Sequence, residues 1–210
     1  EAYDAELLSR ELDLFEQWFV KEVLGVRIDS AGQIIIDKLY SDLICSALEQ
    51  PKVVVHRDYH SRNLMILDDD SIGVIDFQAA VYGPITYDLV SLLKDCYVRW
   101  PVKLIQERVL NYKQRLEQLG LIDDVNDQAF LRWFDLMGLQ RHIKVMGIFS
   151  RLALRDRKVG YLNDLSLVVA YSLEITTLYP ETHEFGYWFK QNIMPHVQKQ
   201  SWYNDRSGQL

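Results

Sequence analysis

The stretch HRDYHSRN, residues 56–63, places several reactive side chains between two short apolar segments. His56, Asp58 and His60 occupy alternate positions, which on an extended segment would put the three side chains on one face. Histidine and aspartate are common zinc ligands, so a metal site is one interpretation. The remaining histidines are His142, His183 and His196, and none of them has a ligand-like spacing such as HxxxH. Spacing alone therefore gives this interpretation weak support.

The second interpretation of the same stretch is phosphoryl transfer. That reaction needs a carboxylate to orient or deprotonate the attacking hydroxyl, and oxygen ligands for Mg²⁺. Asp58 and Asn63 have the D-x-x-x-x-N spacing of a kinase catalytic loop, in which the aspartate acts as base and the asparagine reaches a magnesium ion. A second carboxylate, Asp76, follows in the sequence IDFQ. Two motifs in this order favour phosphoryl transfer over a metal cage.

The elements that must position these residues follow from the apolar pattern. Apolar residues at three- and four-residue steps predict helices over 3–24, 34–48, 87–98, 101–119, 127–154 and 161–178. Short apolar runs predict strands at 53–55, 64–67 and 71–77, with the run DDD between the last two as the turn of a hairpin. Residues 79–84 are mostly small and predict a loop. We expect a mainly α-helical protein with a small β-hairpin insertion that carries the polar motif.

Composition and charge exclude several classes of function. The chain has 210 residues and a formal net charge of −7, which is a poor basis for nonspecific nucleic-acid binding. No apolar run approaches the ~18 residues of a membrane helix, and the acidic, amphipathic start does not resemble a signal peptide. Cys45 and Cys96 have no paired spacing, which argues against a disulfide framework and for a reducing, cytoplasmic setting. We therefore expect neither a nucleic-acid nor a membrane partner.

Three motifs together resemble the aminoglycoside phosphotransferase and choline kinase-like family, which has a protein-kinase-like fold. HRDYHSRN is similar to the family's catalytic loop, including a histidine two residues after the aspartate, and IDFQ is similar to its second motif. GPITYDL, residues 83–89, resembles a third motif, in which the aspartate is Asp88. The resemblance extends from the first predicted helix to about residue 180, which is most of the chain.

The resemblance implies roles for individual residues, with ATP and Mg²⁺ as cofactors and a nucleotide and a small-molecule acceptor as partners. Asp58 is the implied catalytic residue, and Asn63 and Asp76 are the implied ligands of a Mg²⁺ ion that bridges the ATP phosphates. Asp88 is expected to support the loop from the start of a helix, where a carboxylate also interacts favourably with the helix dipole. His56 is expected to brace the loop by hydrogen bonds.

A narrower resemblance concerns the acceptor. HRD in place of HGD, and the segment LQRHIKVMGIFSRLALRD at 139–156, are similar to the bacterial anomeric amino-sugar kinases. This resemblance implies transfer of the γ-phosphoryl group to an amino sugar such as N-acetylmuramate or N-acetylglucosamine. His60, Arg141 and His142 are then candidate substrate contacts. The alternatives are an aminoglycoside- or choline-type kinase, and a non-catalytic kinase-like lobe that binds a partner.

Kinase elements that hold the ATP phosphates are not found before the catalytic loop. A kinase needs a glycine-rich loop over the phosphates, but Gly25 and Gly32 are the only glycines before His56. We therefore expect residues 1–210 to be the C-terminal catalytic lobe, with its catalytic and metal-binding loops at 53–77, a flexible tail at 196–210 and the N-terminal lobe absent. The lobe alone should have little or no kinase activity. Its face toward the absent lobe should be apolar and prone to self-association.

Overall fold

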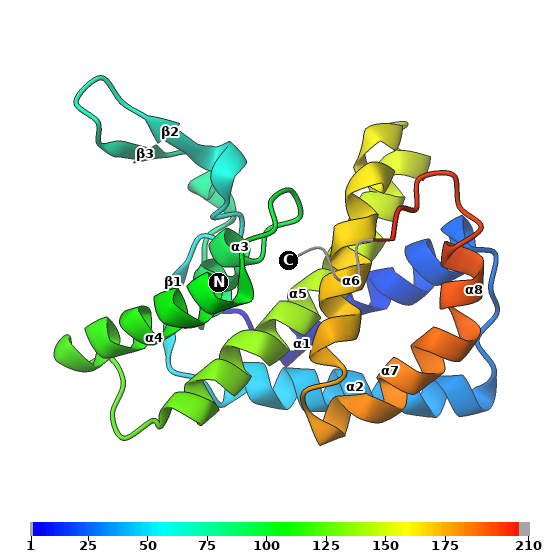
Figure 1. Cartoon of the computed structure of the whole chain (residues 1–210), viewed down its shortest axis with the longest axis horizontal. Coiled ribbons are helices and arrows are strands. Elements are labelled where there is room, and N and C mark those ends of the chain that lie inside the picture. Colours follow the sequence, from blue (N-terminus) through cyan, green and yellow to red (C-terminus); the bar gives the residue numbers. More distant parts are fainter. Residues whose placement is uncertain (1, 206–210) are drawn as a thin grey trace. The chain divides into compact units, whose positions relative to one another are not determined.

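The computed structural model describes residues 2–205 and is mainly helical (Figure 1). The helices are α1 (Ala5–Leu14), the π-helical stretch η1 (Phe15–Val23), α2 (Ser30–Leu48), α3 (Tyr87–Leu93), α4 (Val102–Gln118), α5 (Asp127–Leu154), α6 (Leu165–Ile175), α7 (Pro180–Asn192) and α8 (Met194–Val197). Short 3-10 turns are η2 (Ser61–Asn63), η3 (Phe77–Ala79) and η4 (Val159–Asp164). The strands are β1 (Lys52–Val55), β2 (Leu64–Ile66), β3 (Ile72–Val74) and β4 (Val81–Pro84). The predicted mainly helical fold with a small β insertion is confirmed.

The described chain divides into two compact units. The first contains residues 2–4 and 46–138, and the second contains residues 5–45 and 139–205. The three motifs that resemble a phosphotransferase all lie in the first unit, whereas Arg141 and His142 belong to the second. Over residues 2–205, none of the helices combines the length and the apolarity of a membrane span.

Two small antiparallel sheets organise the first unit. β1 pairs with β4, with Val53 opposite Gly83, and β2 pairs with β3 as the predicted hairpin. β4 corrects the prediction of a loop over 79–84. The small residues there indicated a loop, but Gly83 belongs to the strand and allows the close approach of Tyr3. A Cβ at Gly83 would lie 3.0 Å from the Tyr3 Cβ. Proline is tolerated at the edge of so small a sheet.

Helix α3 ends at Leu93, earlier than the predicted end at residue 98. The reason lies in Asp95, whose carboxylate accepts hydrogen bonds from the backbone N–H groups of Tyr97 (2.9 Å) and Val98 (2.7 Å). An aspartate that bonds its own downstream backbone offers those N–H groups an alternative to the helical ladder. The chain therefore leaves the helix at this aspartate.

Aromatic packing and one close helix approach hold the second unit together. The Phe15 ring stacks on Phe19 and Phe189, with centroids 5.6 and 6.2 Å apart, and all three side chains are buried. At Gly147, α5 approaches the end of α1 so closely that a Cβ on this glycine would overlap the backbone of Leu14. The predicted single helix over 3–24 changes from α to π directly after that contact.

Replacing Gly147 with alanine should lower the free energy of unfolding by about 2–3 kcal/mol, since the added methyl group meets backbone that cannot rotate away. Urea denaturation of the chain would measure this loss. Gly160→Ala is the matched control, because a Cβ at Gly160 meets nothing within 4 Å. A stability for Gly147→Ala equal to that of Gly160→Ala would contradict the close approach.

Two more helices, α7 and α8, precede the end of the described chain, which packs within the second unit. Pro180 indicated the end of a helix, yet it also begins α7, because proline is well suited to the first position of a helix. The predicted flexible tail, 196–210, is described as far as residue 205. Within that part Trp202 is buried, and Ser166 Oγ donates to the Trp202 carbonyl (3.3 Å) and accepts from the Asn204 N–H (2.9 Å). Residues 206–210 of the predicted tail lie outside the described residues.

Candidate active site

The predicted catalytic loop connects β1 to β2 and brings Asp58 and Asn63 together. The Asn63 side-chain amide donates a hydrogen bond to the Asp58 carbonyl oxygen (2.9 Å), and the His60 N–H donates to the same oxygen (3.1 Å). The Asn63 N–H in turn donates to the His60 carbonyl (2.9 Å). These bonds fold the loop back on itself, so that the candidate base Asp58 and the candidate metal ligand Asn63 lie close together, with both residues half-buried.

Asp88, in the first turn of α3, holds the start of this loop. Its two carboxylate oxygens accept the backbone N–H groups of His56 (2.6 Å) and Arg57 (3.0 Å). Arg57 has a φ of 75°, a left-handed conformation that favours glycine and costs energy for other residues. The glycine of the HGD form of the motif would adopt this conformation without strain. Asp88 thus has the geometry that its expected supporting role requires.

His56 links the loop to the end of β3. Its Nδ1 accepts the Asp58 N–H (3.3 Å), so its Nε2 carries the proton and donates to the Ile75 carbonyl (2.9 Å). The ring is therefore occupied on both nitrogens by backbone groups. This arrangement is consistent with the expected role of His56 in bracing the loop by hydrogen bonds, and it leaves neither ring nitrogen available to bind a metal ion.

Asp76 lies beside Asn63 at the base of the β2–β3 hairpin. The Ile75 N–H donates to the Asn63 carbonyl (3.1 Å), which places the next residue, Asp76, next to the asparagine. Asp76 is exposed and has a φ of 67°, and its carboxylate accepts a hydrogen bond from the Gln78 side chain. An amide oxygen and a carboxylate at one edge of a hairpin are hard ligands of the kind that Mg²⁺ prefers.

The metal-cage interpretation finds no support in the geometry. In the described part of the chain, no group of three or more His, Cys, Asp or Glu side chains is arranged to hold a metal ion. A magnesium ion in a kinase needs fewer, because one or two protein ligands act together with the substrate phosphates. Two protein ligands, the number expected from Asn63 and Asp76, would be enough for such an ion.

The three candidate substrate contacts have different surroundings. His60 packs edge-on against Tyr97, with ring centroids 5.7 Å apart. Arg141 and His142 lie on the part of α5 that belongs to the second unit, with 4% and 0% of their surface exposed. The His142 ring stacks on Tyr171 at a centroid distance of 5.1 Å. This packing gives His142 a place in the core of its unit.

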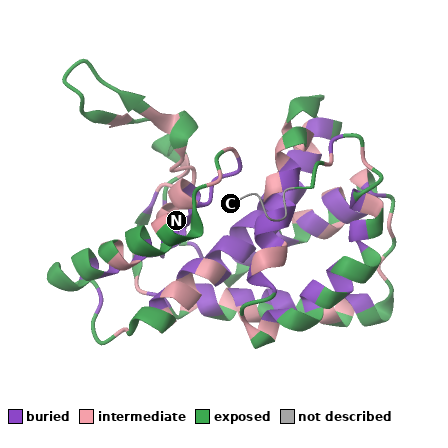
Figure 2. Ribbon diagram, viewed as in Figure 1, coloured by how far each residue is buried: buried purple, intermediate pink, exposed green. Residues whose placement is uncertain are grey.

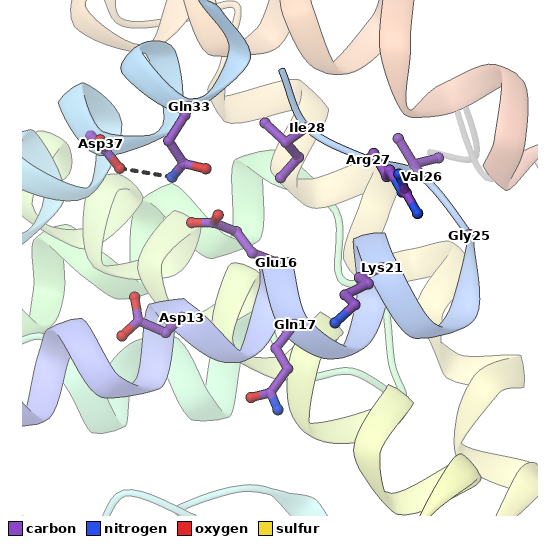
Figure 3. A pocket seen from close by; sticks show the side chains of 10 residues that line it. All are labelled: Asp13, Glu16, Gln17, Lys21, Gly25, Val26, Arg27, Ile28, Gln33 and Asp37. Carbon is purple, nitrogen blue, oxygen red and sulfur yellow. Dashed lines mark hydrogen bonds between the residues drawn. The ribbon is translucent and has the colours of Figure 1, made fainter. Parts of the chain in front are cut away.

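A hollow of about 770 Å³ in the second unit is lined by none of the predicted site residues (Figure 3). Its lining is Asp13, Glu16, Gln17, Lys21, Gly25, Val26, Arg27, Ile28, Gln33 and Asp37. Within it, Gln33 on α2 donates a hydrogen bond to Asp37 (2.9 Å), and Glu16 points toward Gln33. Burial raises the pKa of Glu16, and the charges of Asp37 and Asp13 raise it further, against the lowering effect of the Gln33 hydrogen bond. No sequence motif marked this hollow.

Glu16→Gln should stabilise the chain at neutral pH. A carboxyl group whose pKa is raised by folding stabilises the protein only at low pH, and this contribution is lost as the pH rises through the raised pKa. The gain from glutamine should therefore be small near pH 4 and should grow toward pH 7 in thermal unfolding. Glu22→Gln, an exposed glutamate on the same stretch, controls for the loss of a surface charge. A gain of equal size at both pH values would contradict the pKa shift.

Comparison with known proteins agrees with the motifs. A sequence model described as the phosphotransferase enzyme family matches residues 2–122. The chain is 44% identical over 185 residues to an N-acetylmuramate/N-acetylglucosamine kinase of Pseudomonas putida, covering 88% of the chain and 54% of the relative. Proteins of the same name from Pseudomonas aeruginosa and Neisseria meningitidis are 42% and 41% identical, covering 88% and 85% of the chain and 54% and 53% of the relative.

The chain thus spans about half the length of the curated relatives it matches. The matched range 2–122 contains the catalytic loop, Asp76 and Asp88. The resemblance read from the three motifs is confirmed, and the chain belongs to the phosphotransferase enzyme family.

Proposed function

We propose that the protein containing this chain is an ATP-dependent kinase that phosphorylates a hydroxyl group of an amino sugar, N-acetylmuramate or N-acetylglucosamine. The observation that carries the proposal is the juxtaposition of Asp58, Asn63 and Asp76 through backbone and amide hydrogen bonds. The acceptor class is supported by the names of the relatives at 41–44% identity.

In this proposal Asp58 acts as the general base toward the hydroxyl group of the acceptor. Its carboxylate orients the sugar hydroxyl and takes its proton as the oxygen forms a bond to the γ-phosphorus. The bond from that phosphorus to the bridging oxygen of ADP breaks, and ADP leaves with the bonding electrons. Asn63 and Asp76 would hold Mg²⁺, which when bound would neutralise charge on the phosphates. Most of the catalytic effect then comes from positioning and charge.

The β2–β3 hairpin beside these residues is largely exposed (Figure 2), and many of its exposed side chains are apolar. We define the hairpin surface as the apolar side chains on both sides of the hairpin and at its base that are at least 40% exposed: Met65, Ile66, Leu67, Ile72, Val74, Ile75 and Phe77. Exposed apolar side chains that occur together in this way mark a surface that another part of a protein covers. We propose that polypeptide corresponding to the other half of the relatives covers the hairpin surface and supplies the remaining ATP contacts. Residues 1–210 alone should then turn over little or no ATP.

The proposed activity can be tested on the full-length protein. ADP release should be measured with ATP, Mg²⁺ and each of four acceptors: N-acetylmuramate, N-acetylglucosamine, choline and an aminoglycoside. We expect turnover with the two amino sugars, and phosphorus NMR should show a new sugar phosphate. A higher kcat/KM for choline or the aminoglycoside would reject the amino-sugar assignment. ADP release that needs no acceptor would reject the kinase assignment.

A further inference from the structure

The middle of the catalytic loop contacts a short segment that directly follows α3. Ser61 Oγ donates a hydrogen bond to Asp95 Oδ2 (3.1 Å). The guanidinium carbon of Arg62 lies 3.4 Å from the centroid of the Tyr97 ring. The His60 ring meets the same tyrosine edge-on, with centroids 5.7 Å apart. Three consecutive loop residues are therefore in contact with two side chains of this segment, residues 95–97, which we call the loop brace.

The loop brace is itself firmly held. Asp95 is only 2% exposed, and its other carboxylate oxygen accepts the backbone N–H groups of Tyr97 and Val98. A buried carboxylate with three donors has a fixed orientation. Immediately before it, Lys94 forms an ion pair with Asp135 on α5 at 2.8 Å, with both side chains largely buried. The brace thus connects the loop to the core of the first unit.

Helix α3 therefore carries a carboxylate at each end that binds the catalytic loop. Asp88, in its first turn, accepts the N–H groups at the start of the loop. Asp95, just beyond its last turn, accepts the hydroxyl in the middle of the loop. The residues between Asp58 and Asn63 are consequently held by contacts to α3 and the segment that follows it, in addition to the hydrogen bonds within the loop.

We propose that the loop brace is a positioning element of the active site, with Asp95 and Tyr97 as its positioning residues. It determines the path of residues 60–62, and so the placement of Asp58 relative to Asn63. Ordering a loop costs conformational entropy, and contacts to a preformed helix end offset that cost before any substrate binds. The inference rests on the proposed kinase function for its effect on rate, whereas its effect on loop order is independent of that function.

Two substitutions of Tyr97 distinguish the contribution of its ring from that of its hydroxyl group. Tyr97→Ala removes the cation–π contact with Arg62 and the edge contact with His60. Tyr97→Phe keeps both, because neither contact uses the phenolic oxygen. Tyr112→Ala is the matched control: Tyr112 is also half-buried in the first unit, and its ring packs on Phe130 at a centroid distance of 6.5 Å.

The full-length protein should be tested by hydrogen exchange and by steady-state kinetics. In Tyr97→Ala the amides of residues 58–63 should exchange on the order of tenfold faster than in the unsubstituted protein. Tyr97→Phe and Tyr112→Ala should exchange in this region as the unsubstituted protein does. The kcat of Tyr97→Ala should fall about tenfold. Its KM for ATP should stay within about twofold, because the nucleotide contacts are not removed.

Each outcome bears on the loop brace separately from the proposed function. Unchanged exchange at 58–63 in Tyr97→Ala would overturn the proposal, as would equal acceleration in Tyr112→Ala. If the unsubstituted protein lacks kinase activity, the proposed function fails while the exchange measurement still decides the brace. If Tyr97→Ala does not fold, Ser61→Ala replaces it, because it removes only the hydroxyl group that contacts Asp95. Exchange in Ser61→Ala equal to that of the unsubstituted protein would then overturn the proposal.

Discussion

Asp58→Ala in the full-length protein should lower kcat about 10³-fold, because the carboxylate that takes the acceptor proton is lost. The fold should be unaffected. The hydrogen bonds of Asp58 to His56, His60 and Asn63 all use its main-chain N–H and carbonyl groups, which alanine retains. ADP release with a saturating amino sugar measures kcat, and thermal unfolding tests whether the fold is unaffected.

Asp68→Ala is a suitable control for this substitution, since it removes an exposed aspartate of the adjoining hairpin turn. It should leave kcat within about twofold of the unsubstituted protein. Retention of full activity by a folded Asp58→Ala protein would remove Asp58 from the mechanism and would weaken the phosphotransferase interpretation of the whole loop.

Asp88→Asn should lower kcat about 10²-fold and destabilise the fold by about 1–3 kcal/mol. The carboxylate accepts two backbone N–H groups, from His56 and Arg57, with its two oxygens. An asparagine has one oxygen and one NH₂ group, so one backbone N–H would face another donor. The loop would lose the contact that keeps Arg57 at a φ of 75°.

A second substitution tests whether the strained conformation of Arg57 causes the loss of activity in Asp88→Asn. Arg57→Gly removes the cost of the left-handed conformation, so Asp88→Asn combined with Arg57→Gly should recover part of the lost activity. Arg57→Gly alone should keep most of the activity, although it removes the 3.5 Å bond from Arg57 to the Ala79 carbonyl. An additive loss in the double variant would show that Asp88 acts in another way.

The catalytic part of the site could be predicted because it depends on spacing along the chain. Asp58 and Asn63 are joined within one loop, and Asp76 is joined to them through a hairpin whose turn is visible in the sequence. Asp95 could not be predicted in the same way. It reaches Ser61 across 34 residues, and in the sequence it lies in what looks like an ordinary part of a helix. Its role depends on tertiary contact.

The fold was predictable where local pattern and tertiary packing agree. The bounds of α5 match the predicted 127–154, because its apolar pattern is long. β4 was not predicted because the small residues of 79–84 indicated a loop, and α7 was not predicted because Pro180 indicated the end of a helix. In each case the environment, an edge pairing for Pro84 and a helix start for Pro180, makes the missing N–H harmless. Arg141 and His142 show another limit, because the sequence does not reveal which groups their buried side chains contact.

The carboxylates of Asp88, in the first turn of α3, and of Asp95, just beyond its end, make the length of that helix a constraint on the chemistry. Adding or deleting one residue within α3 would rotate the segment that follows it by about 100° relative to Asp88, so Asp88 and Asp95 could not both reach the loop. The catalytic loop and α3 are therefore expected to behave as one interchangeable module. A chimera that takes all of residues 56–98 from a relative should keep the geometry of the catalytic loop. A chimera that takes only the loop or only α3 from the relative should lose that geometry.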